Sequence, residues 1–207
     1  MKHPARRPLS WRKAAPAAPG TRIPAAAGAG FSLVETLVVL TIAAVLLGIA
    51  APDLRALLRS QQLKAAAGDL LGAINLTRAQ ALARGRQVRL MPLDPAGRDW
   101  SRGWTVFQDS DGDGEPGPGD ELIAVHGALA PGIATDFAFT SPAPPYYIAY
   151  NGAGRSCSET SSAAARWGTL SLFHGDAIRR IKINMLGRAR VCDPARDTSC
   201  EGAAAPP

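Results

Sequence analysis

The longest apolar run in the chain, FSLVETLVVLTIAAVLLGIAA, covers residues 31–51. A helix of this length spans roughly 30 Å, because each residue adds about 1.5 Å along the axis. That length matches the hydrocarbon core of a bilayer, so the pattern predicts a transmembrane helix over residues 31–51. Glu35 is the one carboxylate in the run. A charge at the centre of a bilayer costs on the order of 3 kcal/mol, so Glu35 needs an explanation.

The pattern then changes to an amphipathic helix over residues 52–85. Pro52 removes one helical hydrogen bond and predicts a kink, but the residues after it are rich in helix formers. Gly85 is the expected stop. Apolar or small residues recur at spacings of three and four, which predicts one buried stripe. The stripe consists of Leu63, Ala66, Leu70, Ile74, Thr77 and Ala81.

After Gly85 the pattern is typical of strands and turns. Eight segments are predicted as strands: residues 86–93, 100–109, 120–129, 136–141, 146–152, 167–175, 177–185 and 187–192. The predicted fold class is therefore α+β, with one long N-terminal helix packed on an antiparallel sheet. We expect a basic leader over residues 1–30, the helix over 31–85, a sheet domain over 86–200 and a disordered tail over 201–207.

The net charge of +6 does not by itself indicate an acidic partner. The whole excess lies in residues 1–30, which hold six basic residues and no acidic one. A basic segment before an apolar run predicts a cytoplasmic N-terminus and a translocated C-terminal domain. Any argument for nucleic-acid binding must therefore rest on a local patch.

Three interpretations fit the apolar run: a secretory signal, a plain membrane anchor and a prepilin signal. The run is long for a secretory signal, and its small-residue cluster precedes it. A plain anchor leaves Glu35 unexplained. The stretch GFSLVE resembles the type IV prepilin signal. That resemblance implies cleavage between Gly30 and Phe31 by a prepilin peptidase, N-methylation of Phe31, and a role for Glu35 in pairing with a neighbouring subunit's amine during assembly.

Later motifs resemble the minor pilin and pseudopilin H family, of the FimT and GspH type. They are LTRAQALARGRQVRL, WSRGWTVFQDSDGDG, GDELI and GRARV, in that order. The resemblance implies a type IV pilin-like fold and a place in a pilus or a type II secretion pseudopilus. Some FimT-type members bind DNA through a GRxR element, which here is Gly187-Arg188-Ala189-Arg190.

A basic cluster surrounds that element. In the strand over residues 177–185, apolar and basic side chains alternate between the two faces. If the chain turns near Gly187, the two later arginines return beside the first strand. We expect a DNA-binding patch made of Arg179, Arg180, Lys182, Arg188 and Arg190. The alternative is a solvated strand face neutralised by Asp176 or Asp193.

The acidic loop DSDGDGEPGPGD has the spacing of a calcium loop, with Asp109, Asp111, Asp113 and Asp120 as candidate ligands. Two prolines and strand flanks favour the alternative of a plain hairpin turn. The sequence predicts no catalytic residues and no cofactor. Trp100, Trp104 and Trp167 are expected in the core.

Of the three cysteines, all in the region after the apolar run, only two can pair within the chain. We expect a Cys192–Cys200 disulfide, because a short loop with a proline separates them, with Cys157–Cys192 as the alternative.

Two functional hypotheses follow. The first is a minor pilin that binds double-stranded DNA for natural transformation. The second is a structural pseudopilin whose partners are its fellow subunits. Both place the chain in the bacterial inner membrane and in an assembled fibre.

Overall fold

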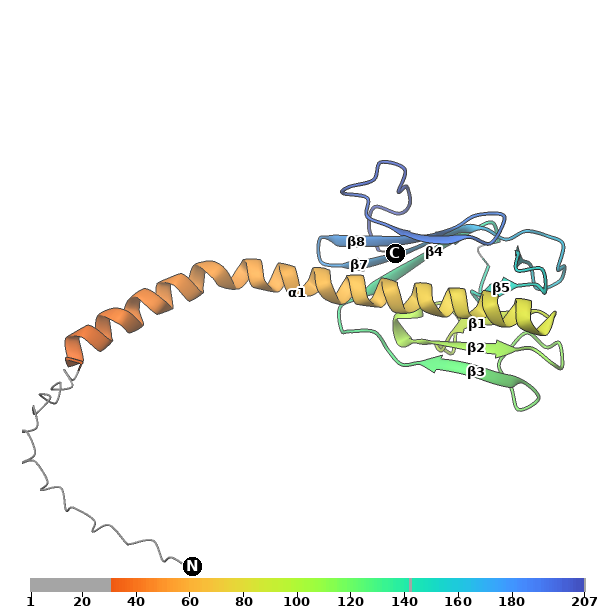
Figure 1. Cartoon of the computed structure of the whole chain (residues 1–207), viewed down its shortest axis with the longest axis horizontal. Coiled ribbons are helices and arrows are strands. Elements are labelled where there is room, and N and C mark those ends of the chain that lie inside the picture. The colour runs from red at the N-terminus through yellow and green to blue at the C-terminus, as the bar shows by residue number, and fades with distance from the viewer. Residues whose placement is uncertain (1–30, 142, 207) are drawn as a thin grey trace, which may run out of the picture. The chain divides into compact units, whose positions relative to one another are not determined.

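The computed structural model describes residues 31–141 and 143–206, apart from the side chains of residues 49–53. The expected leader and Gly30 therefore lie outside the described residues. The chain divides after Val45 into two units, and the second, Leu46–Pro207, contains the sheets. One helix, α1 (Leu33–Arg84), runs through both units without interruption at Pro52 (Figure 1). The prediction that the helix continues past Pro52 is confirmed; the predicted kink stays a prediction.

The helix ends where the sequence predicts. Gly85 has φ +64°, a left-handed conformation that glycine adopts without the steric cost of a Cβ atom. Within the second unit, all six residues of the predicted stripe are at most 4% exposed. Burying a large aliphatic side chain contributes about 1.5–3 kcal/mol, so the leucines and the isoleucine of this stripe fix the helix on the sheets.

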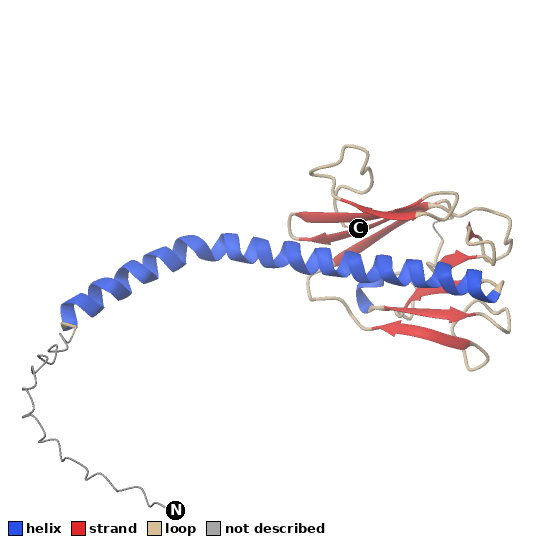
Figure 2. Ribbon diagram, viewed as in Figure 1, coloured by secondary structure: helices blue, strands red, loops and turns tan. Residues whose placement is uncertain are grey.

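The sheet domain holds two antiparallel sheets, where we expected one (Figure 2). The first has the strand order β3-β2-β1-β5-β6 and the second the order β4-β7-β8-β9. The strands are β1 (Val88–Pro92), β2 (Trp104–Gln108), β3 (Glu121–His126), β4 (Ala134–Phe139), β5 (Ile148–Tyr150), β6 (Ser156–Cys157), β7 (Gly168–His174), β8 (Ala177–Ile183) and β9 (Ala189–Cys192).

The eight predicted strands are all present, with two local differences. Trp100–Arg102 forms a short 3-10 helix, η1, so β2 begins only at Trp104. Asp99 caps η1 by accepting a hydrogen bond from the Ser101 backbone N–H at 2.8 Å. The two-residue strand β6 was not predicted, because so short a segment has no recognisable alternation.

One hydrophobic core joins the helix to both sheets. It includes Leu70 of α1, Leu90 of β1 and Leu172 of β7, each 0% exposed. Some strand pairs join distant parts of the chain, such as β1 with β5 and β4 with β7, whereas β7, β8 and β9 follow one another as hairpins.

No stretch of the described residues, α1 included, meets the length and mean hydropathy of a bilayer-crossing helix. The assignment of residues 31–51 as a membrane span rests on the sequence alone, and the side chains of residues 49–51 lie outside the description.

Candidate functional site: a basic hairpin and its covering tail

The β8–β9 hairpin brings part of the predicted basic patch together. Lys182 lies directly opposite Arg190, and Arg180 lies opposite Cys192. The turn is formed by Asn184–Arg188: the Asn184 side-chain oxygen accepts hydrogen bonds from the backbone N–H groups of Leu186 and Arg188. The predicted return of the chain near Gly187 is therefore present in the structure.

Gly187 is required by this geometry. Its φ is +77°, and a Cβ atom added there would lie 2.7 Å from a ring carbon of Tyr150. The buried Tyr150 hydroxyl donates to the Gly187 carbonyl at 3.0 Å, and burial raises the pKa of that hydroxyl. An aromatic side chain of β5 thus packs against the turn and donates a hydrogen bond to it.

The expectation of an exposed Arg180 is wrong. Arg180 is only 5% exposed, because the C-terminal segment folds over its guanidinium group. That group donates hydrogen bonds to the carbonyl oxygens of Cys200 and, at 2.6 Å, Ala203. Ala203, within the segment expected to be a disordered tail over residues 201–207, supplies part of this cover; the disorder of the tail stays a prediction.

Arg179 also leaves the predicted patch. Its guanidinium group forms a 2.9 Å ion pair with Asp193, and both side chains are mostly buried. It lines a hollow with residues of α1 such as Gln61 and Lys64, which places it on the opposite face of β8 from Arg180. Asp193, one of the two acidic residues of the alternative, thus pairs with Arg179, but on the face toward α1 and not on a solvated face.

Three cations remain on the outer face: Lys182, Arg188 and Arg190. Lys182 donates to the Ser199 carbonyl at 3.0 Å. Arg190 forms a 2.9 Å ion pair with Asp197, and the Ser199 and Arg190 hydrogen bonds lower the pKa of Asp197 to about 2. Arg188 is exposed and makes no ion pair within the described part of the chain.

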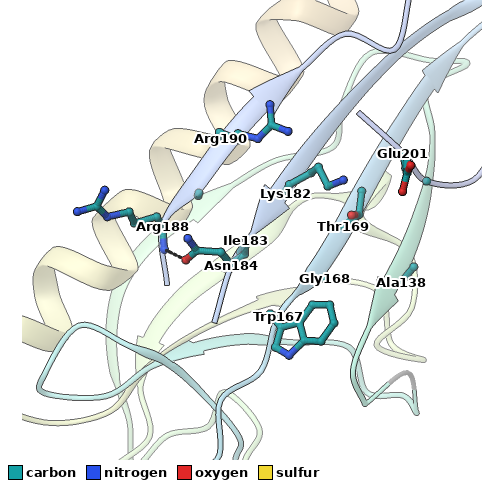
Figure 3. Close-up of a pocket in the computed structure, with 12 residues that line it drawn as sticks. Ala138, Trp167, Gly168, Thr169, Lys182, Ile183, Asn184, Arg188, Arg190 and Glu201 are labelled. Atoms are coloured by element: carbon teal, nitrogen blue, oxygen red, sulfur yellow. Dashed lines mark hydrogen bonds between the residues drawn. The ribbon is translucent and has the colours of Figure 1, made fainter. Parts of the chain in front are cut away.

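These three cations line a groove of about 750 Å³ between β7, β8 and β9 (Figure 3). Arg188 points away from Lys182, so the positive charge is spread along the rim. Trp167 also lines the groove and is 46% exposed. Trp100 and Trp104 are buried as expected, but the expectation of a buried Trp167 is wrong, because it precedes β7 on the outer face of the sheet.

A disulfide joins Cys192 to Cys200, with a Cα–Cα distance of 5.8 Å. This is the pair that the sequence favoured, and Cys157 is a free, buried cysteine. Burial raises the pKa of the Cys157 thiol. The disulfide closes the loop that carries Asp197 and Ser199, so the groups that contact Lys182 and Arg190 are tied to β9.

At the other end of the chain, Ser32 caps the start of α1. Its hydroxyl oxygen accepts a hydrogen bond from the Glu35 backbone N–H at 3.1 Å. Ser32 and Glu35 have the spacing of a capping box, and an acidic side chain is favoured in the first turn of a helix. The cap uses the Glu35 backbone N–H and not its carboxylate. Phe31, just before the cap, is 75% exposed.

The four aspartates of the acidic loop converge. One carboxylate oxygen of each lies within 4.8 Å of the others. The loop also has internal partners: Asp109 accepts from the Gly112 N–H at 2.7 Å, and Asp120 from the Ser110 N–H at 2.8 Å. These contacts are typical of turns and form without a metal ion, so calcium binding stays a prediction.

Arg89 is the residue beside this loop that the sequence analysis missed. Its side chain is 4% exposed, pairs with Asp109 at 3.1 Å and with Glu159 at 3.2 Å, and donates to the Gly114 carbonyl at 3.0 Å. Arginine side chains are rarely fully buried unless they are paired, as Arg89 is here. No local pattern reveals that a distant acidic loop covers it.

Residues 66–187, more than half of the chain, match the family model described as Type II transport protein GspH. The chain belongs to the GspH family. The resemblance drawn from the sequence motifs is thus confirmed at the level of the family. Membership of this family makes the chain a type II transport protein of the GspH type.

Two solved structures are similar to this GspH-family chain. The type IV minor pilin FimU of Pseudomonas aeruginosa is 17% identical, with a TM-score of 0.48, over 65% of this chain and 91% of FimU. The minor pseudopilin EpsH of the type 2 secretion system of Vibrio cholerae is 18% identical, with a TM-score of 0.42, over 64% of this chain and 98% of EpsH. No curated protein sequence gives a significant match.

Proposed function

We propose that this chain is a minor pilin of a type IV pilus that binds double-stranded DNA without sequence preference, as a step in natural transformation. In this proposal a prepilin peptidase cleaves between Gly30 and Phe31 and methylates Phe31. Residues 31–51 hold the subunit in the inner membrane, with the N-terminus cytoplasmic and the sheet domain periplasmic. The subunit then joins other pilins in a fibre, where Glu35 pairs with a neighbour's terminal amine. No catalytic step is part of this proposal.

The observation that carries the DNA-binding part is the group of three cations along one groove. Arg188 has no acidic partner among the described residues, and Lys182 and Arg190 lie directly across from each other. Arginine makes forked hydrogen bonds to phosphate oxygens, and each phosphate contact releases condensed counterions. The patch is smaller than the five residues first expected, because Arg179 and Arg180 already have protein partners. Weak binding by one subunit suits a pilus that must later release its DNA.

The alternative is a structural pseudopilin of a type II secretion system, with no DNA ligand. In that case Arg190 and Lys182 would serve only to hold the loop that the disulfide closes. Asp197 and Ser199 of that loop accept hydrogen bonds from Arg190, and the Ser199 carbonyl accepts one from Lys182. The two hypotheses share the fold, the processing and the fibre. They differ in whether the groove binds a polyanion.

The test is fluorescence anisotropy of a labelled duplex with the full chain in detergent, at several salt concentrations. With two or three phosphate contacts, we expect log affinity to fall against log salt with a slope of about −2 to −3. The double variant Arg188→Gln, Arg190→Gln should lose most of the binding. The matched control is Arg55→Gln, Arg59→Gln on α1, where both residues are exposed. The secretion hypothesis would be favoured if the wild type does not bind the duplex at about 50 mM salt. It would also be favoured if the control variant loses as much binding as the Arg188/Arg190 variant.

A further inference from the structure

The exposed Trp167 is a second feature of the groove, beside the cations. The function proposed above does not use it. The other two tryptophans of the sheet domain are buried and stacked on neighbouring rings: Trp100 on Phe137 and Trp104 on His126. Trp167 has no such ring partner within the described residues. An aromatic side chain that is nearly half exposed and unstacked leaves one face of its ring available to a ligand.

The strand register places this ring beside the cations. Thr169 lies directly opposite Lys182, and Lys182 lies directly opposite Arg190. Trp167 is two residues before Thr169, so it shares the outer face with them and lies diagonal to Lys182. Diagonal neighbours on adjacent strands are about 7–8 Å apart, within reach of long and aromatic side chains. Figure 3 shows Trp167 at one end of the groove, with Lys182 and Arg190 toward the other.

Small residues are also among those that line the groove: Ala138, Gly168 and Ala189. The backbone of Trp167 is fixed, because its carbonyl oxygen accepts from the Thr140 N–H at 3.0 Å. The indole is therefore presented from a rigid strand end and not from a mobile loop. Glu201 also lines the groove, and its carboxylate repels a phosphate, which favours phosphate contact on the side of Arg188 and Arg190.

We propose that this groove binds unpaired nucleotides of DNA, with a base stacked on Trp167 and the adjacent phosphates held by Lys182, Arg188 and Arg190. This inference rests on the proposed function, because it needs the same cations. A positively charged groove beside an aromatic platform is how proteins bind single strands, since every base has a flat face and a duplex hides it. Frayed or nicked ends and single-stranded stretches thus bind more tightly than an intact duplex.

The test compares three probes on the full chain in detergent by fluorescence anisotropy: a 12-nucleotide oligo-dT, an abasic oligonucleotide with the same number of phosphates, and a blunt duplex. Base stacking on an aromatic side chain stabilises the bound strand, so we expect oligo-dT to bind roughly tenfold more tightly than the abasic strand. Trp167→Ala should remove that difference. Trp167→Phe, which keeps a ring, should retain part of it.

The controls separate this inference from the function on which it rests. Trp167 is exposed, so thermal unfolding of Trp167→Ala should match the wild type; a lower midpoint would move the comparison to Trp167→Phe and Trp167→Leu, which differ in aromaticity at similar size. Equal binding of oligo-dT and the abasic strand, with normal duplex binding, overturns the stacking and leaves the proposed function standing. Absence of binding to all three probes overturns both.

Discussion

Lys182 and Arg190 face each other across β8 and β9, and the carboxylate of Asp197 lies 2.9 Å from the Arg190 guanidinium group. Two cations at this separation repel unless an anion is near. In the free protein, the carboxylate of Asp197 is that anion. A phosphate that binds here must compete with Asp197.

Replacing Asp197 with Asn should therefore strengthen DNA binding. The change removes the carboxylate that competes for Arg190 and keeps a side chain of similar size. We expect a several-fold gain in affinity for duplex DNA at about 50 mM salt and a steeper salt dependence, because one more cation becomes available for phosphate. Anisotropy titrations of the full chain measure both quantities. The control is Asp176→Asn, an acidic residue of the β7–β8 turn, which should leave the affinity unchanged.

The same residue predicts an acid-dependent change in stability. Hydrogen bonds from Ser199 and Arg190 lower the pKa of Asp197 to about 2, below the ordinary value near 3.9. Its contribution to folding is then present above pH 4 and is lost as the pH falls toward 2. Thermal unfolding midpoints of wild type and Asp197→Asn should differ slightly at pH 6 and converge near pH 2. A difference that grows toward low pH would contradict this assignment.

Arg89→Met should destabilise the sheet domain strongly. The substitution leaves Asp109, whose side chain is 6% exposed, without its cation and removes the donor to the Gly114 carbonyl. Breaking one partner of a buried ion pair costs about 3–5 kcal/mol. Denaturant unfolding followed by tryptophan fluorescence measures the loss. The matched control is Arg84→Met: its ion-pair partner Glu121 has a side chain that is 58% exposed, so this pair should contribute far less.

This ion pair also bears on the calcium prediction. Arg89 already places positive charge against the first aspartate of the loop, so we expect EDTA to leave the unfolding midpoint of the wild type unchanged. A midpoint that rises with millimolar calcium, and fails to rise in Asp111→Asn, would instead support an ion at the four aspartates.

Gly187→Ala should damage the turn that presents Arg188. A residue with a Cβ atom at φ +77° is strained, and the added atom would meet Tyr150 and the Ser156 backbone nitrogen at 2.7 and 2.8 Å. We expect a loss of about 1–3 kcal/mol in unfolding free energy. Gly127→Ala is the control, because a Cβ there has open space and the backbone is not left-handed. Equal effects of the two substitutions would remove the argument.

Co-expression with a prepilin peptidase should shorten the chain by residues 1–30 and leave a methylated Phe31. Intact-mass analysis measures both changes. Gly28→Ala, at the other glycine of the same stretch, is the control and should still be processed. A wild-type chain that stays uncut, or is cut near Ala51, would exclude the prepilin interpretation.

Glu35→Ala should be inserted and processed but fail to join fibres, and the helix cap at Ser32 should survive the change.

The sequence predicts local features of the fold well and long-range ones poorly. The buried stripe from Leu63 to Ala81 follows from helix geometry, and alternation locates most strands. The division into two sheets depends on which strands pair with one another. No local sequence pattern encodes that pairing. Arg180 illustrates the same limit at the site, because its burial is caused by a tail that starts 20 residues later in the chain.

The buried stripe of α1 also determines how the sheet domain carries mechanical load. From Leu63 to Ala81 the stripe extends about 27 Å along the helix axis, at about 1.5 Å per residue. A pull along that axis shears all of these contacts together, whereas a pull across it would peel them one turn at a time. A subunit held through α1 under tension thus resists in its stronger direction, and substituting Leu70 or Ile74 with Ala should lower the rupture force more than an equal loss at the sheet edges.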